Sequence, residues 1–200
     1  MQLWRAAIDV AGTPAETYLR SRSLPASPPK TIRFLRSYRY DETRRLPCLV
    51  AAVQAPSRDI VAVQLTFLDQ SGSRKAEVEH PRRAIGPLGD ALLRLAPVAE
   101  HLGLAEGFET AWAASLLENS SPVWATLGAD RFGVVTLPQT VRRVTIYADY
   151  DAPSLSNALA FFARHPELDV WIARPPIIGA DFAQILELQS AASKAAARFK

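Results

Sequence analysis

The sequence predicts an α/β protein: an open, mainly parallel sheet with helices on both faces, preceded by a smaller α+β module. From about residue 98, short continuous apolar runs alternate with helical segments, a pattern typical of parallel sheets covered on both faces. Earlier in the chain, two β-rich runs at 46–55 and 59–68 are separated by a Pro-Ser-Arg turn, which predicts an antiparallel hairpin. We therefore expect two domains, residues 1–97 and residues 98–200.

The first part should begin with a short helix. Thr13 is a suitable N-cap, Pro14 suits the first helical position, and Glu16 would complete a capping box. This helix should end near Ser23, before a proline-rich stretch. Cys48 lies within an apolar run of the predicted hairpin, so we expect a buried and unreactive thiol.

The second part should contain four apolar strands and several helices. The strands are expected at 102–105, 123–126, 144–148 and 170–173. The helices are expected at 108–117, 154–164 and 180–188, followed by an alanine-rich helix at the end of the chain. Trp112, Trp124 and Trp171 fall within these elements, and we expect all three in the core.

Composition excludes several classes of protein. An apolar fraction of 48% and a charged fraction of 22% are those of an ordinary globular protein, and no apolar run approaches the roughly 18 residues that span a bilayer. Charged residues interrupt the beginning of the chain, so no secretory signal is expected, and we predict a cytoplasmic protein without membrane association. A single cysteine excludes an internal disulfide and a multi-cysteine zinc site. No P-loop, Gly-x-Ser-x-Gly or Gly-x-Gly-x-x-Gly motif is present.

Positive charge is concentrated in the first half. Residues 1–100 contain 15 Lys/Arg and 10 Asp/Glu, whereas residues 101–200 contain 8 and 10. Arginines are interleaved with aromatic residues between positions 20 and 45, which suits a polyanion because Arg pairs with phosphates and aromatic rings stack on bases. A solvated basic face would give the same pattern, and the sequence does not separate the two. The candidate nucleic-acid-binding residues are Arg33, Arg36, Arg39, Arg44 and Arg45.

Acidic residues follow two predicted strands of the second half. Glu106-Gly107 lies where one strand turns into a helix, and Asp149-Tyr150-Asp151 ends the most apolar strand. Both fall at the carboxyl ends of strands, where open α/β sheets place their ligands. Gly107 would let the backbone turn sharply. Carboxylates without His or Cys suit Mg²⁺ or Mn²⁺, although each motif alone is usually a solvated turn.

These motifs resemble those of a known domain family. The segment 104–111, Leu-Ala-Glu-Gly-Phe-Glu-Thr-Ala, resembles the glutamate motif of Toprim domains, and 147–151, Tyr-Ala-Asp-Tyr-Asp, resembles their Asp-x-Asp motif. The intervening chain is similar to Toprim domains of phage and plasmid DNA primases, and parts of residues 18–87 resemble the module that often precedes them.

The resemblance implies a Toprim fold and Mg²⁺-dependent phosphoryl or nucleotidyl transfer on nucleic acid. It implies Glu106 as catalytic acid/base and co-ligand, and Asp149 and Asp151 as metal ligands. Asp181 is a weaker fourth candidate ligand; the alternative is a charge at the start of a helix. Where relatives often have Lys and a second acid, this chain has Ala180 and Gln184.

Three hypotheses about function remain open. The first is a DNA primase-like nucleotidyltransferase, the second a Toprim-type nuclease, and the third a non-catalytic module of a mobile element that binds nucleic acid or a partner. The expected partners are single-stranded DNA, nucleotides, and a helicase or other replication protein.

Overall fold

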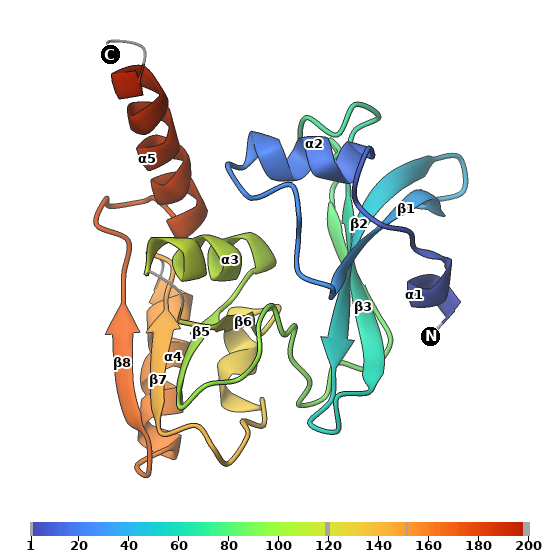
Figure 1. Ribbon diagram of the computed structural model, residues 1–200. Coiled ribbons are helices and arrows are strands. Elements are labelled where there is room, and N and C mark those ends of the chain that lie inside the picture. Colours follow the sequence, from blue (N-terminus) through green and yellow to red (C-terminus); the bar gives the residue numbers. More distant parts are fainter. Residues whose placement is uncertain (1, 119–120, 151, 198–200) are drawn as a thin grey trace. The chain divides into compact units, whose positions relative to one another are not determined.

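A computed structural model of the chain describes residues 2–118, 121–150 and 152–197 (Figure 1). The chain divides into two compact units, Met1–Leu93 and Arg94–Lys200, which are described separately below. Within the described ranges, no helix has the length and apolar character needed to cross a membrane.

The first unit is built on a four-stranded antiparallel sheet of strand order β1-β2-β3-β4. The strands are β1 (Ile32–Arg39), β2 (Arg45–Gln54), β3 (Ile60–Phe67) and β4 (Arg82–Ile85). The predicted antiparallel hairpin is confirmed as β2 and β3, with the turn residue Arg58 at φ 74°. The two flanking strands, β1 and β4, were not predicted.

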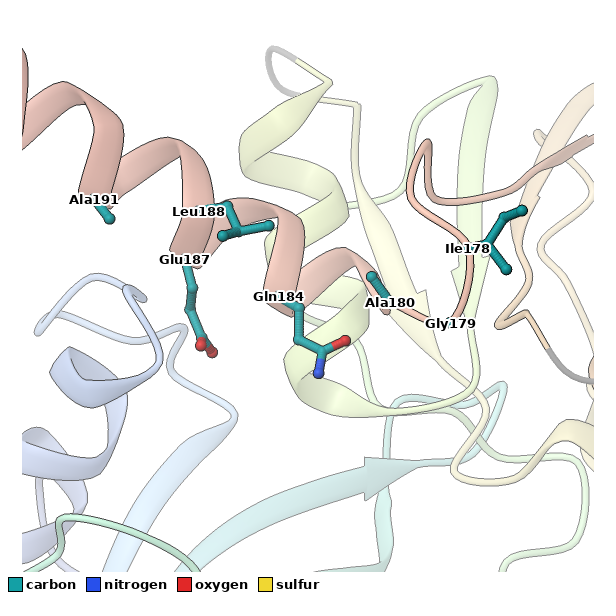
Figure 2. Close-up of a pocket in the computed structure, with 7 residues that line it drawn as sticks. All are labelled: Ile178, Gly179, Ala180, Gln184, Glu187, Leu188 and Ala191. Atoms are coloured by element: carbon teal, nitrogen blue, oxygen red, sulfur yellow. The ribbon is translucent and has the colours of Figure 1, made fainter.

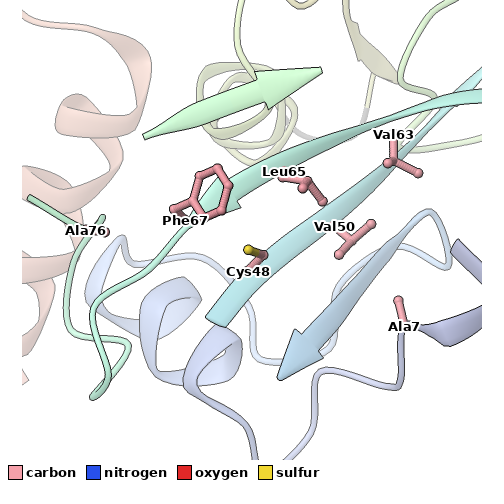
Figure 3. Packing of buried hydrophobic residues seen from close by; sticks show 7 residues of the cluster. All are labelled: Ala7, Cys48, Val50, Val63, Leu65, Phe67 and Ala76. Carbon is pink, nitrogen blue, oxygen red and sulfur yellow. The ribbon is translucent and has the colours of Figure 1, made fainter. Parts of the chain in front are cut away.

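Both faces of this sheet are covered along β2, because its consecutive residues 47–53 are all buried. On one face, a buried cluster includes Cys48, Val50 and Phe67 (Figure 3). Leu3 and Trp4 of α1 (Gln2–Ala6) pack against this cluster. A second helix, α2 (Pro14–Ser21), has its own buried apolar side. Burial raises the pKa of the Cys48 thiol to about 12, although nearby Arg83 opposes the shift. Cys48 is buried, as predicted, and its thiolate, which is the reactive form, is therefore disfavoured.

The start of α2 differs from the predicted capping box. The Thr13 hydroxyl donates to the carbonyl of Val10 at 2.6 Å and does not cap the helix. Glu16 accepts the N–H of Gly12 at 2.7 Å and also forms an ion pair with Arg20 at 2.7 Å. The predicted residues are therefore all at the helix start, but Glu16 satisfies a backbone donor one position earlier than a capping box would.

A tight loop between β3 and β4 lies against the first turn of α2. Asp69 holds this loop together by accepting hydrogen bonds from the hydroxyls of Ser71 at 3.0 Å and Ser73 at 2.8 Å. Gly72 has φ 75°, and a Cβ at this position would lie 2.0 Å from the carbonyl oxygen of Pro14. The loop approaches α2 so closely that only glycine fits there.

The second unit contains a parallel sheet of strand order β6-β5-β7-β8, which confirms the predicted fold class. Its strands are β5 (His101–Ala105), β6 (Val123–Ala125), β7 (Arg143–Tyr147) and β8 (Asp169–Ala173). Its helices are α3 (Phe108–Leu117), the 3-10 helix η1 (Ala129–Gly133), α4 (Ala152–Arg164) and α5 (Phe182–Ala197).

The strand order places helices on both faces of the parallel sheet. The step from β5 to β6 runs in the opposite direction to the step from β7 to β8, so right-handed crossovers put α3 and α4 on opposite faces. Phe182 of α5 packs edge-on against Tyr147 of β7 with ring centroids 5.1 Å apart, and α5 also contacts α3. On the other face, α4 contacts η1 (Figure 1), and Arg164 of α4 donates to the carbonyl of Gly133 at 3.1 Å.

The prediction that Trp171 is in the core is wrong. Trp171 is 60% exposed, whereas Trp112 and Trp124 are buried as predicted. Trp171 lies on β8, which is an edge strand, and its indole N–H donates to Asp169 at 2.8 Å. A short apolar run has the same sequence pattern in a central strand and in an edge strand. The pattern therefore could not indicate that Trp171 would be exposed.

Candidate functional site

The parallel strands of the second unit end together at one edge of the sheet, here named the carboxyl edge. Ala105 at the end of β5 pairs with Tyr147 at the end of β7, and Tyr147 pairs with Ala173 at the end of β8. Glu106 directly follows β5, and Asp149 lies two residues beyond β7. Since adjacent strands are about 4.8 Å apart, the fold brings these two acidic residues to neighbouring strand ends.

Asp149 is held at the carboxyl edge by its main chain. Its N–H donates to the hydroxyl of Ser154 at 3.0 Å, and the preceding residue, Ala148, donates to the carbonyl of Ala173 at 3.0 Å. Ser154 is completely buried in the first turn of α4. Asp149 itself is half-buried, with its Oδ1 atom inaccessible to solvent. The segment that follows β7 is therefore fixed in place where it leaves the sheet.

The other proposed ligand of the Asp-x-Asp motif, Asp151, lies outside the described residues. Across 2–118, 121–150 and 152–197, the structure forms no group of three or more His, Cys, Asp or Glu side chains that could hold a metal ion. The described part of the predicted acidic cluster thus consists of Glu106 and Asp149 at neighbouring strand ends.

The turn after β5 is tied to the turn after β6. The N–H of Leu127 donates to the carbonyl of Glu106 at 2.8 Å, and the N–H of Thr126 donates to the carbonyl of Ala105 at 2.9 Å. Gly107 has φ −105° and ψ 158°, an extended conformation open to any residue. A Cβ on Gly107 would come no closer than 3.8 Å to a neighbouring atom, that of Thr110. The backbone therefore does not require glycine at position 107.

Asp181 caps the last helix. Its Oδ1 accepts the N–H of Gln184 at 2.7 Å, and the side-chain oxygen of Gln184 accepts the N–H of Asp181 at 2.8 Å. This reciprocal pair satisfies two backbone donors at the start of α5. Gln184 also lines a shallow pocket of about 540 Å³ along α5, together with exposed Ile178 and Leu188 (Figure 2). Neither Glu106, Asp149 nor Asp181 lines this pocket.

Sequence reasoning missed two charged residues near the carboxyl edge. Glu109 is only 3% exposed in the first turn of α3, and its Oε2 lies 3.9 Å from where a Cβ of Gly107 would be. The available signal was its place in the first turn of the predicted helix, three residues after Glu106 in the sequence. Arg174 directly follows β8, and its guanidinium lies 3.9 Å from the ring centroid of Tyr150. The contact is between residues that follow two different strands, β7 and β8, so no local sequence pattern indicated it.

The candidate nucleic-acid-binding arginines lie on β1, in the turn that leads into β2, and at the first residue of β2. Arg33 is half-buried over the ring of Trp4, at 4.3 Å, and donates to the Trp4 carbonyl at 3.1 Å. Arg44 pairs with Asp41 at 2.6 Å, and this guanidinium holds the pKa of the carboxyl well below its usual range. Arg36 is exposed. The remaining two candidates, Arg39 and Arg45, are also exposed and donate to the Asp41 carbonyl and the Ser37 hydroxyl.

The aromatic residues interleaved with these arginines are already packed within the unit. Phe34 is 2% exposed, and Tyr40 lies edge-on to Phe67 with ring centroids 5.0 Å apart. The guanidinium groups of Arg44 and Arg83 lie 4.8 and 5.0 Å from the Tyr40 ring centroid. Base stacking on Phe34 or Tyr40 is therefore not favoured. The hypothesis that this surface binds a polyanion rests on the exposed arginines.

Two domain families match the chain. Residues 1–95 match a domain of unknown function (DUF7146), and residues 101–192 match the Toprim domain. None of the curated proteins matches the chain significantly.

Several solved structures share the fold. The primase fragment of the bacteriophage T7 primase-helicase protein has a TM-score of 0.55 at 13% identity, covering 86% of this chain and 65% of its own. A DNA primase domain from Pseudomonas aeruginosa has a TM-score of 0.51 at 13% identity, covering 76% of this chain and 52% of its own. This chain thus spans between half and two thirds of these two structures. Residues 101–192 thus match the Toprim domain, and the chain shares the fold of these primase structures.

Proposed function

We propose that this protein carries out Mg²⁺-dependent nucleotidyl transfer on nucleic acid, with Glu106, Asp149 and Asp151 as its acidic site. The observation that carries the proposal is the placement of Glu106 and Asp149 at the carboxyl ends of adjacent parallel strands of a Toprim domain. Open α/β sheets bind their ligands at this edge.

The donor set fits a hard divalent cation. The proposed ligands are all carboxylates, and oxygen ligands without His or Cys suit Mg²⁺ or Mn²⁺ rather than zinc. Asp149 and Asp151 would hold the ion, with Glu106 as co-ligand. A bound ion would screen the phosphodiester and stabilise charge on the attacking and leaving oxygens. We leave Asp181 out of the set because its Oδ1 already caps α5.

Glu106 is the proposed acid/base. Its side chain is half-buried, and its main-chain carbonyl is fixed by the N–H of Leu127. A carboxylate held in this way can accept the proton of an attacking hydroxyl and return it to the leaving oxygen.

The exposed arginines of the first unit are the proposed nucleic-acid surface. We expect Arg36→Gln plus Arg45→Gln to weaken binding of a single-stranded oligonucleotide. Each lost phosphate contact should also lower the slope of log affinity against log salt concentration by about 0.7. Fluorescence anisotropy over a series of salt concentrations measures both effects.

Arg58→Gln is the matched control for this double variant. Arg58 is also exposed but lies in the turn between β2 and β3, at the other end of β2 from Arg45. Arg58→Gln should leave both affinity and slope unchanged. The double variant removes two charges and the control removes one, so a control that loses half as much log affinity would show that binding follows total charge rather than this surface.

Two assays separate primer synthesis from cleavage. Primase-like activity predicts that short primers form on a single-stranded template when NTPs and Mg²⁺ are supplied. A nuclease would instead cleave labelled DNA without NTPs. Cleavage without synthesis would overturn the proposed reaction while keeping the acidic site.

One observation favours a second candidate function. Asp181 and Gln184 are hydrogen-bonded to each other at the start of α5. The Asp181 carboxylate therefore caps the helix and is not an additional acidic group of the site. A Toprim domain with this thinner acidic set could bind nucleic acid or a replication protein, such as a helicase, without catalysis. Oligonucleotide binding together with no product in either assay would support this candidate.

A further inference from the structure

Arg174 is placed beside the candidate acidic site by the pairing of β7 and β8. Tyr147 pairs with Ala173, so Arg174 leaves the sheet at the same edge as the Asp149 segment. Its guanidinium lies 3.9 Å from the ring centroid of Tyr150, and its Nη2 is 3.5 Å from the Tyr150 carbonyl oxygen. Tyr150 lies between the two aspartates of the motif, so this cation is held next to the proposed metal ligands.

Within the part of the chain that the structure describes, the charge of Arg174 is not used in an ion pair. Among the described residues, no carboxylate lies within ion-pair distance of its side chain. At the opposite edge of the same sheet, by contrast, Arg143 pairs with Asp169 at 2.6 Å. Arg174 is exposed to solvent, and its one hydrogen bond within the described chain is long.

The stacked arrangement leaves most of the guanidinium donors available. A guanidinium carries five N–H donors in its plane, and stacking on an aromatic face uses none of them. The Tyr150 carbonyl engages one, so the others can point toward a ligand at the carboxyl edge. Their fork matches two oxygens of a phosphate group.

We propose that Arg174 binds a phosphate group of the substrate at the carboxyl edge. This inference rests on the proposed function, because it assigns a ligand to the same site. A phosphate drawn to the acidic edge by a metal ion would still face the negative charge of the carboxylates. Arg174 supplies a fixed positive charge on the adjacent strand end, and Tyr150 orients it. The phosphate comes from either a nucleic-acid strand or a nucleoside triphosphate.

The test compares Arg174→Gln with Arg142→Gln. Arg142 is also exposed and also hydrogen-bonded to a main-chain carbonyl, that of Gln139 at 2.7 Å, but it precedes β7 at the opposite edge of the sheet. Binding of a labelled single-stranded oligonucleotide and of ATP is measured separately, each with MgCl₂. We expect Arg174→Gln to weaken at least one of them roughly tenfold, and Arg142→Gln to weaken neither. The affected ligand identifies the source of the phosphate.

Two further variants separate binding from a structural role. Arg174→Lys keeps the charge but not the fork, so its affinity should fall between those of the unaltered protein and Arg174→Gln. Tyr150→Leu removes the stacking surface and should weaken the same ligand without lowering the urea midpoint of unfolding. If Tyr150→Leu weakens binding and also lowers the urea midpoint, the lost affinity reflects lost folding stability, and the proposed binding role is overturned.

The remaining outcomes distinguish this inference from the proposed function. If the unaltered protein binds both ligands and Arg174→Gln binds them as tightly as Arg142→Gln, the role of Arg174 is overturned and the acidic site stands. If the unaltered protein binds neither ligand, the proposed function and the role of Arg174 fail together.

Discussion

Glu106→Gln is expected to lower the rate of primer synthesis by about a hundredfold or more. Glutamine has nearly the same size and shape as glutamate, but its amide cannot accept a proton. The main-chain hydrogen bond that positions residue 106, from the N–H of Leu127, does not involve the side chain and should persist. Oligonucleotide affinity should therefore change little while turnover falls. Single-turnover primer synthesis on a single-stranded template measures the effect.

Glu118→Gln is the control for this substitution. Glu118 is exposed at the C-terminal end of α3, whereas Glu106 precedes its N-terminal end. The control removes the same charge at a distance from the carboxyl edge and should retain full activity. Primer synthesis by Glu106→Gln at the rate of the control would remove Glu106 from the proposed chemistry.

Gly72→Ala is expected to have the largest effect on stability. The left-handed conformation, φ 75°, costs an alanine about 1 kcal/mol. The new Cβ would also lie 2.0 Å from the carbonyl oxygen of Pro14, so the loop must move away from α2. Because backbone rather than a flexible side chain blocks the space, we expect about 1–3 kcal/mol more from this overlap. Urea unfolding followed by circular dichroism measures the loss.

Gly12→Ala isolates the contribution of the overlap. Gly12 has nearly the same backbone conformation, φ 70°, but a Cβ there would meet no atom within 4 Å. Gly12→Ala should therefore lose only the conformational part, about 1 kcal/mol. Equal destabilisation by the two substitutions would contradict the close approach of the loop to α2.

The parallel sheet was predictable because its pattern is local. Buried strands give continuous apolar runs, so β5, β6 and β7 and the helices between them follow from the sequence. Strand β1 was missed because arginines occupy positions 33, 36 and 39, and because an irregularity between Leu35 and Tyr38 breaks the alternation. The exposure of Trp171 depends on strand order, which no single segment encodes.

The candidate site, like the fold, could be predicted only in part from the sequence. Glu106 and Asp149 could be placed at strand ends from sequence because each directly follows an apolar run. The contacts around them could not. Ser154 reaches the main chain of Asp149 after the chain turns into α4, and Arg174 reaches Tyr150 across neighbouring strands. Asp181 could be read either as a ligand or as a helix charge, and its hydrogen bond to Gln184 uses it as a cap.

The most direct test of the acidic site is a calorimetric titration with Mg²⁺ and Mn²⁺. The unaltered protein, Asp149→Ala and Asp181→Asn should be compared, since asparagine can still cap α5. The proposed site predicts saturable binding by the unaltered protein and by Asp181→Asn, and its loss in Asp149→Ala. Unchanged binding in Asp149→Ala, or no binding by the unaltered protein, would contradict a metal centre at the carboxyl edge.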